Sequence, residues 1–121
     1  MDRRKELKLQ YKMNPPPMGI YQIRNTKNGK IYIGSSMNIP GKFNSARMQL
    51  NGGSHMSSQL QADWREFGES AFAFETLATL DPDKFPQEEW RKELATMLEL
   101  WLEELQPYDD KGHHRIPKQK G

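Results

Sequence analysis

Cysteine is absent from the 121 residues of this chain. Disulfide bonds, thiolate metal sites and a cysteine nucleophile are therefore excluded, and this composition is typical of a reducing compartment. Long apolar runs are missing as well, since none approaches the roughly 18 residues of a membrane span, and the first residues lack the apolar stretch of a signal peptide. We expect a cytoplasmic protein that does not use a membrane as a partner, with one domain.

Acidic side chains are also missing from one part of the chain. Residues 1–62 carry ten Lys and Arg against two Asp and Glu, a net charge of +8, and no carboxylate occurs between residues 14 and 62. Residues 63–108 carry four basic and twelve acidic residues, a net charge of −8, and residues 109–121 add +2. This division indicates a basic face suited to a polyanion. The alternative for the acidic half is that its helices are ordinary solvated helices.

The two ends of the chain differ in composition from its middle. Residues 1–17 predict a short basic helix followed by a stiff connector, because Pro15, Pro16 and Pro17 permit neither helix nor strand pairing. Residues 109–121 are basic and predict a flexible tail. The domain itself is expected over residues 18–108.

Two runs of β-branched and aromatic residues predict a β-hairpin. They span Gly19–Arg24 and Lys30–Gly34, and the turn-forming residues Asn25–Gly29 separate them. A four-residue loop would place Tyr21 directly opposite Tyr32 on one face of the sheet. A tight two-residue turn would keep both side chains on that face but offset them along the strands.

The rest of the chain predicts three helices and one further strand. We expect a helix from Asn38 to about Leu50, a helix from Ser57 or Ser58 to Phe67, a strand over Ala71–Leu80, and a helix from near Pro86 to before Pro107. The last helix carries an apolar stripe of Trp90, Leu94, Leu98, Trp101 and Leu105. The fold class is therefore α+β, a small three-stranded antiparallel sheet flanked by helices.

Gly19-Ile20-Tyr21 and Tyr32-Ile33-Gly34 form a two-part motif in the hairpin. This motif resembles the signature of the GIY-YIG nuclease superfamily, and the resemblance extends over roughly residues 18–108. It includes Asn28-Gly29-Lys30 in the hairpin loop, Phe67-Gly68-Glu69 and Pro107-Tyr108.

The resemblance implies an active site for phosphodiester hydrolysis, in which two tyrosines lie beside the scissile phosphate. Tyr21 and Tyr32 match them. The family's phosphate-binding arginine falls on Lys42, its assisting histidine on Ala46 and its metal-binding glutamate on Leu98. Lys42 keeps the charge without the planar fork of a guanidinium. The site is therefore depleted: no metal ligand is predicted, and Mg²⁺ or Mn²⁺ would be needed only if the protein is active.

Three functional hypotheses follow. The first is a nucleic-acid-binding protein, with DNA as its expected partner, on an endonuclease scaffold that has lost or strongly reduced phosphodiester hydrolysis. The second is a divalent-metal-dependent endonuclease with an unorthodox site, and the third is a protein-interaction module with an unknown partner. The predicted catalytic residues are Tyr21, Tyr32 and Lys42. The predicted nucleic-acid-binding residues are Arg24, Lys27, Lys30, Lys42 and Arg47.

The three histidines carry less information. We expect His55 to cap or pack a loop, and no carboxylate or cysteine lies at ligand spacing from His113 or His114. Trp64, Trp90 and Trp101 lie on helical faces and are expected in the core.

Overall fold

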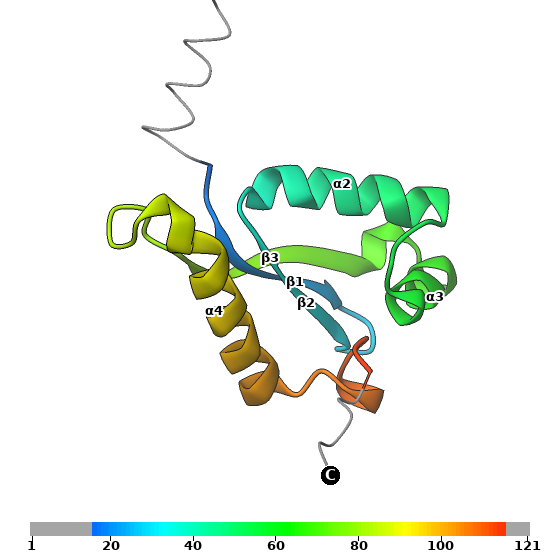
Figure 1. Cartoon of the computed structure of the whole chain (residues 1–121). Coiled ribbons are helices and arrows are strands. Elements are labelled where there is room, and N and C mark those ends of the chain that lie inside the picture. The colour runs from blue at the N-terminus through cyan, green and yellow to red at the C-terminus, as the bar shows by residue number, and fades with distance from the viewer. Residues whose placement is uncertain (1–15, 116–121) are drawn as a thin grey trace, which may run out of the picture.

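The computed structural model describes residues 16–115, and Figure 1 shows its strands flanked by helices. The predicted α+β class is confirmed. Most of the predicted N-terminal helix and connector, and residues 116–121 of the predicted tail, lie outside the described residues. The elements run in the order β1 (Gly19–Asn25), β2 (Ile31–Ser36), α2 (Ile39–Gly52), α3 (Ser58–Phe67), η1 (Glu69–Ala71), β3 (Phe72–Thr79), η2 (Gln87–Glu89), α4 (Trp90–Leu105) and η3 (Asp109–Lys111).

The strands form one antiparallel sheet in the order β2-β1-β3. The predicted hairpin is present, but the predicted register is wrong: Tyr21 lies opposite Gly34, and Tyr32 lies opposite Ile23. The connecting loop extends over residues 26–30, because the buried Asn25 accepts a hydrogen bond from the backbone of Lys27 and widens the turn. A two-residue shift preserves the alternation of faces, so both tyrosines still lie on one face, as diagonal neighbours.

Two helices begin where the sequence places their caps. The side chain of Asn38 accepts a hydrogen bond from the Gly41 N–H at 3.1 Å, and Ser57 accepts one from the Leu60 N–H at 3.2 Å. Helix α2 ends at Gly52 and is capped by Gly53, whose φ of 77° is in the left-handed region that glycine tolerates. These caps fix the length of α2 and place the N-terminus of α3 beside the hairpin.

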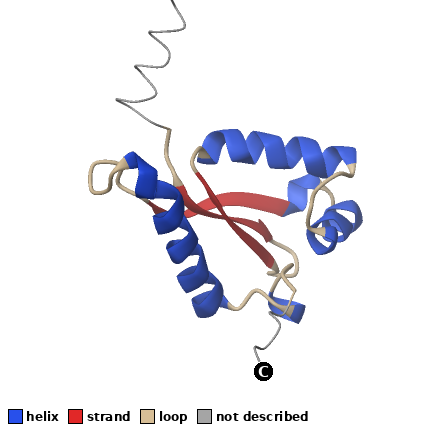
Figure 2. Ribbon diagram, in the orientation of Figure 1, coloured by secondary structure: helices blue, strands red, loops and turns tan. Residues whose placement is uncertain are grey.

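The sheet separates two layers of helices. Figure 2 shows α2 and α3 on one side of the strands and α4 on the other. The first side buries a core that includes Tyr21, Ile23, Leu50 and Trp64. On the other side Trp90 and Leu94 of α4 pack with Met18 and Leu80. The predicted burial of Trp64 and Trp90 is confirmed, whereas Trp101 near the end of α4 is only half-buried.

The C-terminal segment, residues 108–115, lies along the free edge of β2. The His113 N–H donates to the Ile31 carbonyl at 2.9 Å, and His114 bonds back to Pro107. His113 is only 3 % exposed. Residues 109–115, which we expected in a flexible tail, are therefore packed against the domain.

No helix within residues 16–115 has both the length and the apolar character that crossing a membrane would require.

Candidate active site

Tyr21 is buried beneath the hairpin, and a glycine makes room for it. The Tyr21 phenol crosses over Gly34 on β2, where a Cβ atom would come within 2.6 Å of the ring carbon Cζ. The ring also packs edge-to-face against Phe43 of α2, with 5.8 Å between centroids. Burial, and secondarily the neighbouring Tyr32, raises the pKa of the Tyr21 phenol. Tyr21 is therefore a neutral phenol at any physiological pH.

Tyr32 is half-buried and lies between two histidines. His114 stacks on its ring at 4.8 Å between centroids with an interplanar angle of 9°, and His55 approaches edge-on at 5.2 Å. Burial raises the pKa of Tyr32 as well. Both motif tyrosines thus present an O–H donor, and neither is available as a phenolate base.

His55 joins Tyr32 to the basic side of α2. Its Nδ1 accepts a hydrogen bond from the Ser57 N–H at 3.0 Å, in agreement with the expected loop-packing role. Burial, and then the nearby Lys42 ammonium, lowers the pKa of His55. Neutral His55 consequently carries its proton on Nε2. Lys42 is half-buried and is a predicted site residue whose charge acts on His55.

A buried polar network holds the C-terminal segment in place. Asp63 of α3 is 7 % exposed and its Oδ2 lies 2.8 Å from Nε2 of His113. The same carboxylate accepts hydrogen bonds from Asn25 at 2.9 Å and from Asn28 at 3.1 Å. Burial opposes the charge, but these hydrogen bonds outweigh it and keep the pKa of Asp63 below its usual range.

Burial likewise lowers the pKa of His113, more than the adjacent carboxylate raises it. The pair is therefore a carboxylate and a neutral imidazole, with the proton on Nε2. The sequence alone did not predict this network, because Asp63 and His113 are 50 positions apart. The only signal for it was a polar residue, Asp63, at a position flanked by the core residues Leu60 and Trp64.

The two lost family positions have different environments. Ala46 is fully buried on the core side of α2, whereas Leu98 is half-buried one turn after Leu94 on the side of α4 that packs on the sheet. Leucine has no atom that can bind a cation. Within residues 16–115 no three His, Asp or Glu side chains gather as a metal site. The residues present do not fit the metal that the resemblance implies.

The predicted nucleic-acid-binding residues fall into two groups. Arg24 is paired with Glu75 at 2.7 Å, and Arg47 lies 4.3 Å above the ring of Phe74. These two cations already have partners within the domain. The remaining three are the lysines Lys27, Lys30 and Lys42, which are exposed or half-buried.

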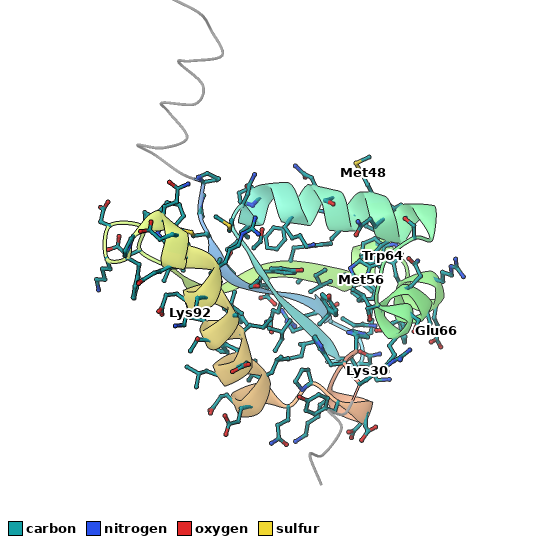
Figure 3. The ribbon with its side chains drawn as sticks, in the orientation of Figure 1. Lys30, Met48, Met56, Trp64, Glu66 and Lys92 are labelled. Carbon is teal, nitrogen blue, oxygen red and sulfur yellow. The ribbon has the colours of Figure 1, made fainter. Side chains whose placement is uncertain are left out.

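Lys27 and Lys30 belong to the hairpin loop, and Lys30 lies at the end of the sheet near the C-terminal segment (Figure 3). Its charge acts on His113, whose pKa it lowers slightly. The same part of the molecule is therefore bordered by the hairpin loop, by Lys42 and by the histidines His55 and His113.

Comparison with known proteins gives concordant results. Residues 17–90, more than half of the chain, match the sequence profile of the GIY-YIG catalytic domain. A stretch of 50 residues is 38 % identical to intron-associated endonuclease 1 of Enterobacteria phage T4. That match covers 41 % of this chain, which spans 20 % of the length of the phage protein.

Two solved structures resemble the whole described domain. A point mutant of the catalytic domain of intron endonuclease I-TevI is 25 % identical with a TM-score of 0.70, over 87 % of this chain and 99 % of that domain. The catalytic domain of homing endonuclease I-TevI is 27 % identical with a TM-score of 0.68, over 84 % and 99 % respectively. Profile, sequence and fold agree with the buried Tyr21, the glycine beneath it and the half-buried Tyr32 on β2, and this chain belongs to the GIY-YIG catalytic-domain family.

Proposed function

We propose that this protein binds nucleic acid, and DNA in particular, on an endonuclease scaffold whose phosphodiester hydrolysis is lost or strongly reduced. The observation that carries the proposal is Leu98, a half-buried apolar side chain at the position where the family resemblance implies a metal-binding carboxylate. The relatives named above are endonucleases, which supports nucleic acid as the partner.

The site also lacks a general base. Hydrolysis requires a group that accepts a proton from the attacking water. The raised pKa values of Tyr21 and Tyr32 keep both phenols protonated. His55 and His114 each use their accepting nitrogen on a backbone N–H, at 3.0 Å from Ser57 and 2.8 Å from Ile33. Losing a single transition-state donor costs about 10² to 10³ in rate, so the combined losses predict very slow cutting.

Binding nucleic acid requires fewer protein groups than hydrolysing it. Phosphate contacts require only accessible cations, and they supply most of the affinity for nucleic acid. Among the predicted nucleic-acid-binding residues, the accessible cations without a partner named above are Lys27 and Lys30 on the hairpin loop and Lys42 on α2. Arg24 and Arg47 are expected to contribute less, because binding a phosphate would compete with Glu75 and Phe74.

A slow endonuclease is the second candidate, and one observation favours it. The ammonium of Lys42 lies close enough to His55 to lower its pKa, and His55 contacts Tyr32. A cation, an imidazole N–H and a phenol O–H thus converge near the position that the resemblance gives to the scissile phosphate. This group can stabilise developing negative charge even without a metal.

One assay separates the two candidates. Supercoiled plasmid is incubated with highly purified protein in Mg²⁺ or Mn²⁺, and retardation and nicking are scored on the same gel. We expect retardation without nicking above the level of a mock purification. Nicking that co-purifies with the protein and disappears in both Tyr21→Phe and Tyr32→Phe would establish the endonuclease instead.

A further inference from the structure

A hollow of about 380 Å³ opens beside Tyr32. It lies where the N-terminus of α3 faces the end of the C-terminal segment, and none of its lining residues is acidic. Its lining consists of Tyr32, Met56, Ser57, Ser58, Gln59, His113, His114 and Arg115. We refer to it as the Tyr32 hollow.

The first turn of α3 offers free backbone donors to the Tyr32 hollow. Helix N-termini carry backbone N–H groups without intrahelical partners and a partial positive charge. In α3, the hydroxyl and carbonyl oxygens of Ser57 satisfy the N–H groups of Leu60 and Gln61. No acceptor among the described residues satisfies the N–H groups of Ser58 and Gln59. Both residues line the hollow.

The opposite wall also presents donors. Nε2 of His114 accepts the Ile33 N–H at 2.8 Å, so neutral His114 must carry its proton on Nδ1. Arg115 is exposed and adds a guanidinium group with a permanent charge. With the α3 terminus, these groups make the hollow a site for an anion.

One ring nitrogen of His113 is a hydrogen-bond acceptor that has no donor. Its Nε2 is committed to Asp63, and its Nδ1 is buried without a hydrogen-bond partner among the described residues. His113 is one of the residues that line the Tyr32 hollow, and its Nδ1 is an acceptor beside a site whose other groups are donors. A buried polar atom without a partner is costly, and a ligand that satisfies it gains that energy.

We propose that the Tyr32 hollow binds a phosphate monoester. The monoanionic form of such a group, which is the minor form at neutral pH because the second pKa is about 6, carries one proton and also presents several acceptor oxygens, and binding beside an acceptor selects this form. The proton satisfies Nδ1 of His113, and the oxygens accept from Ser58, Gln59, His114 and Arg115. An internal phosphodiester has acceptor oxygens but no proton to share. In nucleic acid the matching group is therefore the phosphate at a strand end.

The assignment of the phosphate to the end of a nucleic-acid strand rests on the proposed nucleic-acid binding, whereas the phosphate site itself does not. The same chemistry is present in a free mononucleotide or in inorganic phosphate. Two sets of probes distinguish these sources. The first is inorganic phosphate, with sulfate as an anion of the same shape that carries no proton at neutral pH. The second is a short DNA strand ending in a 5′-phosphate, a 3′-phosphate or free hydroxyls.

Ser58→Pro removes one donor with little other change. Ser58 is the first helical residue, a position where proline is favoured, and Ser57 before it has φ −87° and ψ 107°, which a following proline tolerates. Ser58→Ala is the matched control that keeps the N–H. Arg115→Gln removes the guanidinium, and Lys111→Gln on the same segment, at an exposed position outside the hollow, is its control.

Inorganic phosphate tests the site by NMR of the whole chain. We expect it to shift the amide resonances of Ser58 and Gln59 and to bind about tenfold more tightly than sulfate, the effect of one hydrogen bond to a charged group. Ser58→Pro and Arg115→Gln should each weaken phosphate binding about tenfold, with both controls near the parent. Equal affinity for sulfate would overturn the monoester assignment, and unshifted amides would overturn the site.

The DNA strands then test the source of the phosphate. We expect a terminal phosphate to raise the affinity of the strand about tenfold, and Ser58→Pro to abolish that increase. Phosphate binding without any strand binding would refute the proposed function and leave the site standing. Strand binding that ignores the terminal phosphate would refute the strand-end assignment and leave the proposed function intact.

Discussion

Replacing Asp63 by asparagine should loosen the C-terminal segment from the rest of the domain. The carboxylate accepts from His113, Asn25 and Asn28 at 2.8 to 3.1 Å, and so joins the C-terminal segment, the hairpin loop and α3. An asparagine of the same size keeps one acceptor oxygen, but its NH₂ group would face donors. His113 would then lose the contact that fixes its neighbour His114 on Tyr32.

The magnitude follows from the bonds that are lost. A hydrogen bond to a charged group contributes about 1.5 to 3 kcal/mol, and a buried group left unpaired adds a further penalty. Because the hairpin loop is exposed and relaxes, we expect Asp63→Asn to lower the free energy of unfolding by about 2 to 4 kcal/mol. That is a large part of the roughly 5 to 15 kcal/mol that stabilises a domain.

Urea unfolding followed by tryptophan fluorescence measures this loss, since Trp64 lies next to the substituted residue and Trp90 reports on the opposite layer. Asp83→Asn, an exposed position, is the matched control and should leave stability unchanged. In a double-mutant cycle with His113→Gln, the two changes should be strongly non-additive. An Asp63→Asn protein as stable as the parent, or simple additivity, would refute the role assigned to this network.

Further predictions concern other parts of the fold. Gly34→Ala should displace Tyr21 and lower the free energy of unfolding, measured in urea, by about 1 to 3 kcal/mol. Gly52→Ala, where a Cβ meets open space, is the control and should not lower it. If the two variants are equally stable, the Tyr21 ring does not need a glycine at position 34. Leu98→Glu should lower the free energy of unfolding by about 1 to 3 kcal/mol at neutral pH, because it places a carboxylate at a half-buried position. Leu100→Glu, at a position that is 61 % exposed, should lower it little. No difference between the two variants would show that position 98 is solvated. Stability should decline as pH falls below about 6.5, because the three histidines with lowered pKa values bind protons more readily in the unfolded chain, and a flat profile from pH 7 to 5 would contradict those shifts.

The sequence predicted those parts of the fold that local chemistry determines. Asn38 and Ser57 cap helices where expected, and the alternation of the hairpin placed both motif tyrosines on one face. The register was wrong because it depends on how Asn25 folds the loop, and that side chain is held by Asp63, far along the chain.

The candidate site was less predictable than the fold. Tyr21, Tyr32 and Lys42 were identifiable from the motif and its spacing. The position of His114 was not, because it depends on a segment that returns to the edge of β2 and is held by a buried pair of distant residues. Nor does charge alone show that Arg24 is paired with Glu75, since that contact needs the register of β3.

The salt dependence of DNA binding tests the central claim most directly. Duplex DNA binding by fluorescence anisotropy, measured over a series of salt concentrations, gives the number of phosphates neutralised. With Lys27, Lys30 and Lys42 in contact, log affinity should fall against log salt with a slope of about −3, and Lys42→Gln should flatten it by about one unit. Arg24→Gln, which removes a cation already paired with Glu75, should change the slope less. Absence of duplex binding at low salt, or a slope that Lys42→Gln leaves unchanged, would contradict the account.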